Sequence, residues 1–206
     1  PTHSYMKMLY KYPQTAFPYE ELVTKNAEAG KHNPEYELID TGIFDKNEYF
    51  DIFIEYAKSS QEDILIRITV TNKSSNEVPL ILLPTIWFRN TWSWGYDDYR
   101  PQLNGANSSQ IKINHKELTV KNLYAKKADQ VLFCDNETNN QRLFESKNSG
   151  QFCKDGINDF IINGTADAVN PERKGTKASF VIEELIQAKE TEVFEFRLCD
   201  KDFDQP

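Results

Sequence analysis

Glycine is scarce in this sequence, with only 8 among 206 residues. Neither of the glycine-rich phosphate-binding motifs, GxGxxG and GxxxxGK[S/T], occurs. Such loops need glycine because the backbone must approach a phosphate closely. The sequence therefore argues against a nucleotide-binding domain, and the lack of a GxSxG motif argues against a serine hydrolase of the nucleophile-elbow type.

Cysteine and histidine are also rare. Cys134, Cys153 and Cys199 form no CxxC pair, and their odd number argues against a disulfide framework. We therefore expect reduced thiols and a cytoplasmic location. The three histidines lie far apart in the sequence, so we expect no metal site and no cofactor.

The chain has no basic stripe and no long apolar run. Its formal net charge is −8, whereas binding to a phosphate backbone requires a cluster of Lys and Arg. No apolar run reaches the roughly 20 residues that span a bilayer. We therefore expect neither a nucleic-acid partner nor a membrane-spanning segment.

What the sequence does contain is a strong period-two alternation of apolar and polar residues, which is typical of half-buried strands. In 49–56 and 64–71 every second residue is apolar, and Phe194, Phe196 and Leu198 repeat the pattern near the end. Residues 178–185 predict a further strand. Residues 80–88 predict a nearly continuous apolar strand with a bulge or an edge position at Pro84.

Shorter strands are predicted at 111–113, 117–120, 131–133 and 160–162, separated by turn residues such as Asn and Gly. Many short strands and little convincing helix favour a mainly β fold, a β-sandwich, over residues 1–206 as a single domain. The sandwich proper is expected over 35–200.

Residues 1–34 are rich in aromatic residues and interrupted by Pro13 and Pro18. Because proline disfavours a long helix, we expect an irregular, partly helical arm whose aromatic residues pack on the sheet. A short helix over 18–29 is compatible with Pro18 at its start and Gly30 at its end.

The most informative segment is 87–96, which contains all three tryptophans of the chain within eight residues, together with Arg89 and Asn90. Aromatic faces and polar groups of this kind can line a carbohydrate site. Large aromatic side chains also anchor cores and domain interfaces. The segment 152–159, with Asp155-Gly156 and Asn158, is expected to be a tight polar loop, and function concentrates on such loops.

Adjacent carboxylates at Asp97 and Asp98 are the most obvious acidic pair beside these aromatic residues. Neighbouring residues of a strand face opposite sides, and neighbouring loop carboxylates are usually solvated, so the pair does not provide the geometry of a glycosidase. We assign no catalytic residue in this chain.

Several segments, read together, resemble bacterial members of glycoside hydrolase family 63, the family of the processing α-glucosidases. The longest is Leu83-Pro-Thr-Ile-Trp-Phe-Arg-Asn-Thr-Trp-Ser-Trp94. The others are His3–Met6, Tyr10–Gln14, Pro34–Gly42, Tyr49–Asp51, Glu55–Lys58, Asp63–Asn72, Asn136–Asn139, Lys154–Asn158, Ala168–Pro171 and Gly175–Ala178.

This resemblance implies an N-terminal β-supersandwich domain, similar to the galactose-mutarotase-like sandwiches, followed by an (α/α)₆ barrel that holds the acid and base carboxylates. It also implies that residues 201–206 begin the linker to this absent catalytic domain and that the source is bacterial. The chain would then be non-catalytic, would brace the barrel and could form one wall of its oligosaccharide pocket. The candidate residues for that wall are Arg89, Asn90, Trp92, Trp94, Asp155 and Asn158.

Two alternatives are a stand-alone carbohydrate-binding module and a purely structural interaction domain. If the barrel is the natural partner, its absence exposes an apolar docking face. Such faces tend to pair, so we expect a symmetric homodimer of the isolated chain.

Overall fold

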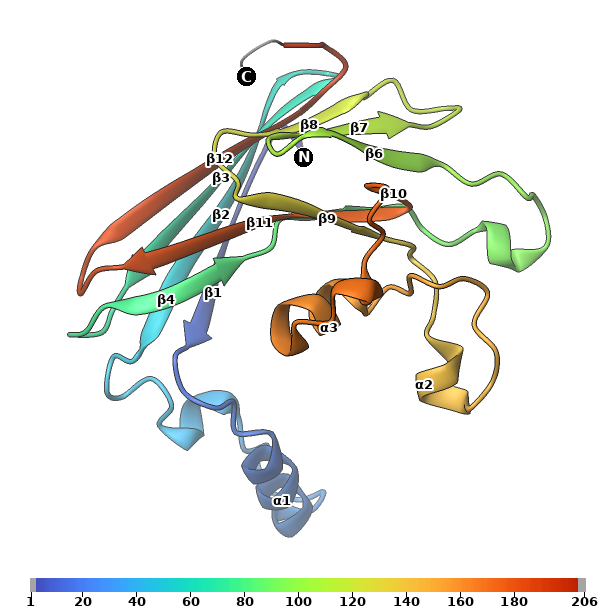
Figure 1. Ribbon diagram of the computed structural model, residues 1–206. Helices are drawn as coiled ribbons and strands as arrows, with labels where there is room; N and C mark the ends of the chain where they lie inside the picture. The colour runs from blue at the N-terminus through green and yellow to red at the C-terminus, as the bar shows by residue number, and fades with distance from the viewer. Residues whose placement is uncertain (1–2, 204–206) are drawn as a thin grey trace.

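The computed structural model describes residues 3–203, which form two antiparallel sheets stacked face to face (Figure 1). The large sheet has eight strands in the order β1-β2-β3-β12-β8-β7-β6-β10, and the small sheet has β4 and β5 on one side of β11 and β9 on the other. The strands are β1 (Tyr5–Pro13), β2 (Tyr49–Ser60), β3 (Asp63–Asn72), β4 (Val78–Leu82), β5 (Thr85–Trp87), β6 (Gln102–Asn107), β7 (Gln110–Asn114), β8 (Asn122–Ala125), β9 (Gln130–Cys134), β10 (Lys174–Gly175), β11 (Lys177–Ile186) and β12 (Thr191–Cys199).

Three α-helices and three short 3₁₀ helices connect the strands. They are α1 (Tyr19–Ala29), α2 (Asn140–Phe144), α3 (Gly156–Asn163), η1 (Leu38–Thr41), η2 (Trp92–Trp94) and η3 (Ala166–Ala168). Figure 1 places α2 and α3 on the side of β9, while α1 extends away from the end of β1. Within residues 3–203 no helix is both long and apolar enough to cross a membrane.

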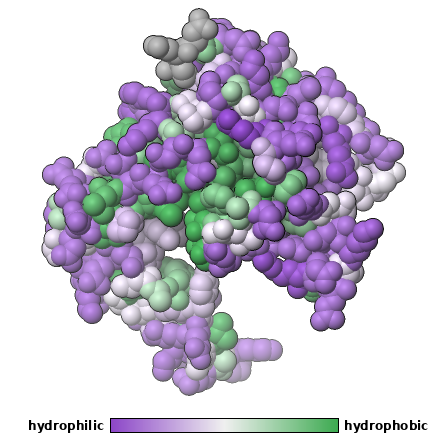
Figure 2. Space-filling view, in the orientation of Figure 1, coloured by the Kyte–Doolittle hydropathy of each residue, from purple (hydrophilic) through white to green (hydrophobic). Residues whose placement is uncertain are grey.

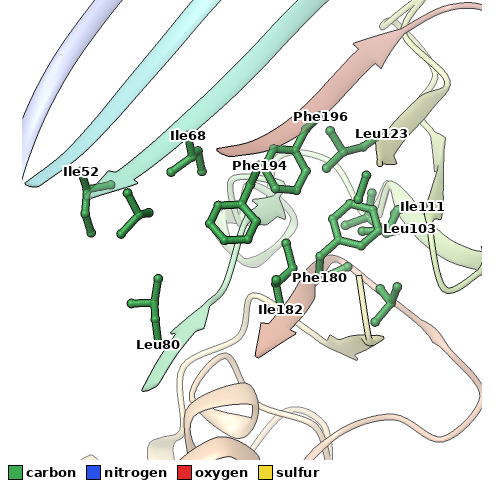
Figure 3. Close-up of a cluster of buried hydrophobic side chains, with 14 of the residues drawn as sticks. Ile52, Ile68, Leu80, Leu103, Ile111, Leu123, Phe180, Ile182, Phe194 and Phe196 are labelled. Carbon is green, nitrogen blue, oxygen red and sulfur yellow. The ribbon is translucent and has the colours of Figure 1, made fainter. Parts of the chain in front are cut away.

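The core lies between the two sheets. Figure 3 shows Phe194 and Phe196 of β12 pointing toward Phe180 and Ile182 of β11. These four side chains are buried, and Phe180 and Ile182 have no solvent-exposed area. The mainly β sandwich expected from the sequence is therefore confirmed.

The period-two strands lie where the alternation placed them. Phe50 and Ile52 of β2 and Ile68 and Val70 of β3 are buried in the core, whereas Arg67, which precedes Ile68, is exposed. Pro84 does interrupt the apolar run, because the chain leaves β4 at Leu82 and enters β5 at Thr85. The positions of these strands and the residues on their buried faces were predictable because one side of each strand faces water.

The expectation of an irregular N-terminal arm is wrong for residues 5–13. They form β1, which pairs with β2 in register from Tyr5–Ala57 to Pro13–Tyr49. The two prolines do not prevent this, because Pro13 ends the strand and Pro18 precedes α1. The expected helix at 18–29 is confirmed as α1.

The predictions of two shorter strands, 117–120 and 160–162, are also wrong. Residues 117–120 are not a strand, and the ladder resumes only at Asn122 in β8. Residues 160–162 belong to α3, because Ile157, Phe160 and Ile161 recur at helical spacing and pack against the small cluster around Val181.

β1 is an open edge of the large sheet, and the small sheet does not cover it. Its inward face carries Met6, Met8, Tyr10 and Tyr12, whose exposed fractions lie between 46% and 54%. Figure 2 shows an apolar area in the middle of this view, surrounded by mostly hydrophilic residues. A long edge strand with exposed apolar residues is a surface that proteins usually cover.

Candidate functional site

The aromatic segment divides into one buried and several exposed rings. Trp92 is 6% exposed, whereas Trp87 and Trp94 are 58% and 51% exposed. The segment turns through η2 and leaves it at Gly95, whose φ of 80° lies in the left-handed region that favours glycine. The two roles expected for the tryptophans, core anchor and ligand contact, thus apply to different residues. Trp92 is an anchor, and Trp94 is available for contact.

A buried carboxylate holds this segment in place. Glu137, in the loop between β9 and α2, accepts hydrogen bonds from Trp92 Nε1 at 2.6 Å and from Asn90 Nδ2 at 3.0 Å. Ser149 Oγ donates at 3.2 Å, and the guanidinium of Arg100 lies 3.3 Å from the same carboxylate. Because a buried charge is stable only when it is paired and hydrogen-bonded, these four partners account for the buried position of Glu137.

Two arginines lie over the tryptophan rings. The Arg89 guanidinium is 4.9 Å from the ring centroid of Trp94, and that of Arg100 is 5.6 Å from the ring centroid of Trp92. Cation–π contacts of this type favour one orientation of a surface ring. Trp94 is therefore oriented at the surface by Arg89 while half of its side chain stays exposed.

Asp155 belongs to a second, neighbouring cluster. Its carboxylate accepts hydrogen bonds from Asn139 Nδ2 at 3.0 Å and from Arg142, whose other amino group reaches Asp159 at 2.6 Å. The pairing with Asp159 and Asp155 raises the pKa of Arg142. The polar groups of Asp155 are thus engaged in holding α2 against α3.

The segment 152–159 is not the tight polar loop that we expected, because α3 begins at Gly156. Asn158 lies exposed on this helix, outside the contacts that join Asp155 to Arg142. The loop 137–139 connects the two clusters, and the backbone N–H of Lys154 donates to the Glu137 carbonyl at 2.9 Å.

The structure therefore brings four of the six candidate residues together, namely Arg89, Asn90, Trp92 and Trp94. Asp155 lies in the adjoining cluster and Asn158 on the surface of α3. Sequence reasoning missed Glu137, the residue on which the first group converges. The segment Asn136–Asn139 was singled out for its resemblance alone, and nothing in its local pattern indicates a buried carboxylate.

Among residues 3–203, no group of three His, Cys, Asp or Glu side chains is arranged to hold a metal ion. The three cysteines are buried and free. Burial raises the pKa of Cys134 to about 12, so this side chain remains a thiol at neutral pH and is a poor nucleophile.

Comparison with curated proteins gives an uncharacterized relative. No protein-family model matches the chain. The chain is 36% identical, over an alignment of 219 residues, to the uncharacterized protein YMR196W of Saccharomyces cerevisiae. The alignment covers 88% of this chain and 20% of the yeast protein, so the chain spans about a fifth of the length of the curated relative that it matches.

Proposed function

We propose that this chain is the non-catalytic N-terminal β-sandwich domain of a glycoside hydrolase similar to the family 63 α-glucosidases. Its role would be to brace an (α/α)₆ catalytic barrel. The observation that carries the proposal is β1, a nine-residue edge strand whose apolar residues are exposed on its inward face. Proteins commonly cover an edge strand of this kind with another part of the structure.

Two further points support a bracing role. A segment similar to this chain occurs in a yeast protein about five times as long, so such a domain exists within a larger polypeptide. The exposed ring of Trp94 stands on a segment that Glu137 holds through Asn90 and Trp92, and Trp87 is exposed at the end of β5. Aromatic side chains supported in this way are common at interfaces and beside sugar rings.

The catalytic part of the proposal is tested by comparing this chain with the longer protein that contains it. We expect the longer protein to hydrolyse p-nitrophenyl α-glucoside and α-linked disaccharides with inversion, and residues 1–206 alone to show no turnover. Deletion of residues 1–206 from the longer protein should abolish the activity, and addition of the purified chain should restore part of it. Turnover by the purified chain alone would contradict the proposal.

The docking surface is tested separately by the oligomeric state. Without its partner domain, the isolated chain should self-associate through β1, giving a mass above 23.9 kDa in sedimentation experiments at high concentration. Met8→Lys places a charge on the inward face of β1 and should return the chain to a monomer. Val23→Lys, a change at an exposed position of α1, is the matched control and should leave the association unchanged. A monomeric wild-type chain under these conditions would count against β1 as a docking surface.

A further inference from the structure

The outer face of the large sheet, which is turned away from the small sheet, carries two adjacent rows of residues that cross several strands. In the first row, Tyr5, Ala57, Leu65, Arg197 and Tyr124 are successive register partners from β1 to β8. They face outward because their chain neighbours, such as Ile66 and Phe196, belong to the core. With strands about 4.8 Å apart, this row is about 19 Å long.

The second row is a ladder of alternating charge. Lys7, Glu55, Arg67 and Glu195 are register partners across β1, β2, β3 and β12, and Lys126 continues the row through the hydrogen bond of its N–H to the Glu195 carbonyl at 3.0 Å. The charges run +, −, +, −, + along the row.

The carboxylates of this ladder are paired with their neighbours. Glu55 lies 4.0 Å from Lys7 and accepts a hydrogen bond of 2.6 Å from the Tyr5 hydroxyl. Glu195 lies 3.0 Å from Lys126 and 3.2 Å from Arg67. These two cations lower the pKa of Glu195. Exposed ion pairs contribute little to stability, so the fold does not require this ordered arrangement.

Between the ends of the first row lies a trough with a volume of about 430 Å³. Its floor is the small side chain of Ala57 beside Leu65, and the Tyr5 ring stands at one end. Tyr124 stands at the other end, and Phe203 packs on it with ring centroids 5.8 Å apart. The ladder borders the trough along one side through Glu55, Arg67, Glu195 and Lys126.

We infer that this trough binds a short neutral oligosaccharide. Its volume is in the range of small-ligand sites, which combine apolar walls with a few polar groups. The floor of Ala57 and Leu65 offers an apolar surface to the C–H face of a sugar ring. The carboxylates and guanidinium groups along the border keep lone pairs and N–H groups free for hydroxyls.

The paired charges of the ladder favour a neutral ligand over a charged one. Each carboxylate of the ladder already has a cationic partner, so a strongly charged ligand would have to replace an existing ion pair, whereas a hydroxyl can add to it. The trough lies on the outer face of the large sheet, opposite the core, and is separate from the Trp94 region. The inference goes beyond the proposed function, since a domain that only braces a catalytic barrel needs no ligand of its own.

The test is calorimetric titration of residues 1–206 with maltotriose and, in parallel, cellotriose at millimolar concentrations. We expect saturable binding of at least one of the two sugars. Ala57→Trp fills the trough and should weaken that binding at least about tenfold. Arg67→Ala removes hydrogen bonds from a charged donor and should weaken it by about tenfold or more.

The matched control is Leu9→Trp, which adds the same ring on the outer face of β1 but outside the trough, and it should bind as the wild type does. Trp94→Ala should also bind normally, which distinguishes the trough from the aromatic end of the sandwich. Absence of binding for both sugars, or unchanged binding by Ala57→Trp, would overturn the inference. Hydrolysis by the longer protein would be unaffected by that result, so failure here and failure of the proposed function are separate outcomes.

Discussion

Replacing Arg197 by methionine is expected to lower the free energy of unfolding by about 3 kcal/mol at pH 7, because it leaves a buried carboxylate without its partner. Asp63 is 2% exposed and accepts two hydrogen bonds from the Arg197 guanidinium, at 2.8 Å and 2.6 Å. The two residues lie on adjacent strands, β3 and β12. Methionine retains much of the side-chain volume, so the loss should come mainly from the charge pair.

The effect should depend on pH in a definite direction. The Arg197 guanidinium holds the pKa of Asp63 below its usual value. Since this folded-state pKa is lowered, the pair stabilises the protein fully above the unfolded pKa of about 4, and the stabilisation is lost as pH falls through the folded pKa. The difference between wild type and Arg197→Met should therefore be large at pH 7 and shrink as pH falls toward the folded pKa, because the buried Asp63 of the variant has lost its cation and becomes neutral at a higher pH than in the wild type.

Urea denaturation at pH 7, 5 and 3.5 measures this difference. The control is Arg67→Met, which breaks an exposed pair with Glu195 and should cost less than about 1 kcal/mol at any pH. An equal loss at pH 7 and pH 3.5 for Arg197→Met would contradict the electrostatic explanation. It would instead indicate loss of packing, since the guanidinium also lies 4.3 Å from the ring centroid of Phe203.

Gly156→Ala should cost about 3 kcal/mol, at the upper end of the usual range for overpacking, because the clash is with backbone. A Cβ atom at Gly156 would lie 2.1 Å from the carbonyl oxygen of Ala168, so α3 and η3 would have to separate. For a chain of this size, such a loss corresponds to a decrease of about 6–12 °C in Tm.

Gly150→Ala is the matched control, since a Cβ atom there meets no other heavy atom within 4 Å. Its Tm should stay within about 2 °C of the wild-type value. Differential scanning calorimetry of both variants gives the comparison. A Gly156→Ala variant as stable as Gly150→Ala would show that the contact between α3 and η3 is easily relaxed.

The sequence pattern predicted the strands that have one solvent-exposed face and one buried face. Arg67 and Ile68 are on opposite sides of β3 as the alternation required, because the period of a strand is two. The pattern failed where burial was not periodic. Residues 160–162 form one apolar run that fits a strand or a helix equally, and only Ile157, one turn earlier, distinguishes them.

The candidate site was predictable in part and for a similar reason. Trp92 and Asn90 are local in sequence, so their clustering could be read directly. Their common partner, Glu137, is 45 residues from Trp92, and its burial depends on how β5 and β9 are joined to the small sheet through β11. No local signal carries that information.

β1 shows the opposite case, in which composition suggested an irregular arm and pairing with β2 produced a regular strand. Its nine residues gain a complete register with β2, which neither the tyrosines nor the prolines reveal in isolation. Tertiary pairing determines such a strand more than its own propensity does.

The positions of the three tryptophans make the intrinsic fluorescence of this protein selective for one region. All tryptophan emission comes from the end of the sandwich near η2, with Trp92 shielded and Trp87 and Trp94 open to quenchers. A sugar that stacks on Trp94 would change the spectrum, whereas one that occupies the trough beside Ala57 would bind without a tryptophan in its lining. A comparison of optical and calorimetric titrations therefore locates a bound ligand on the protein before any complex is solved.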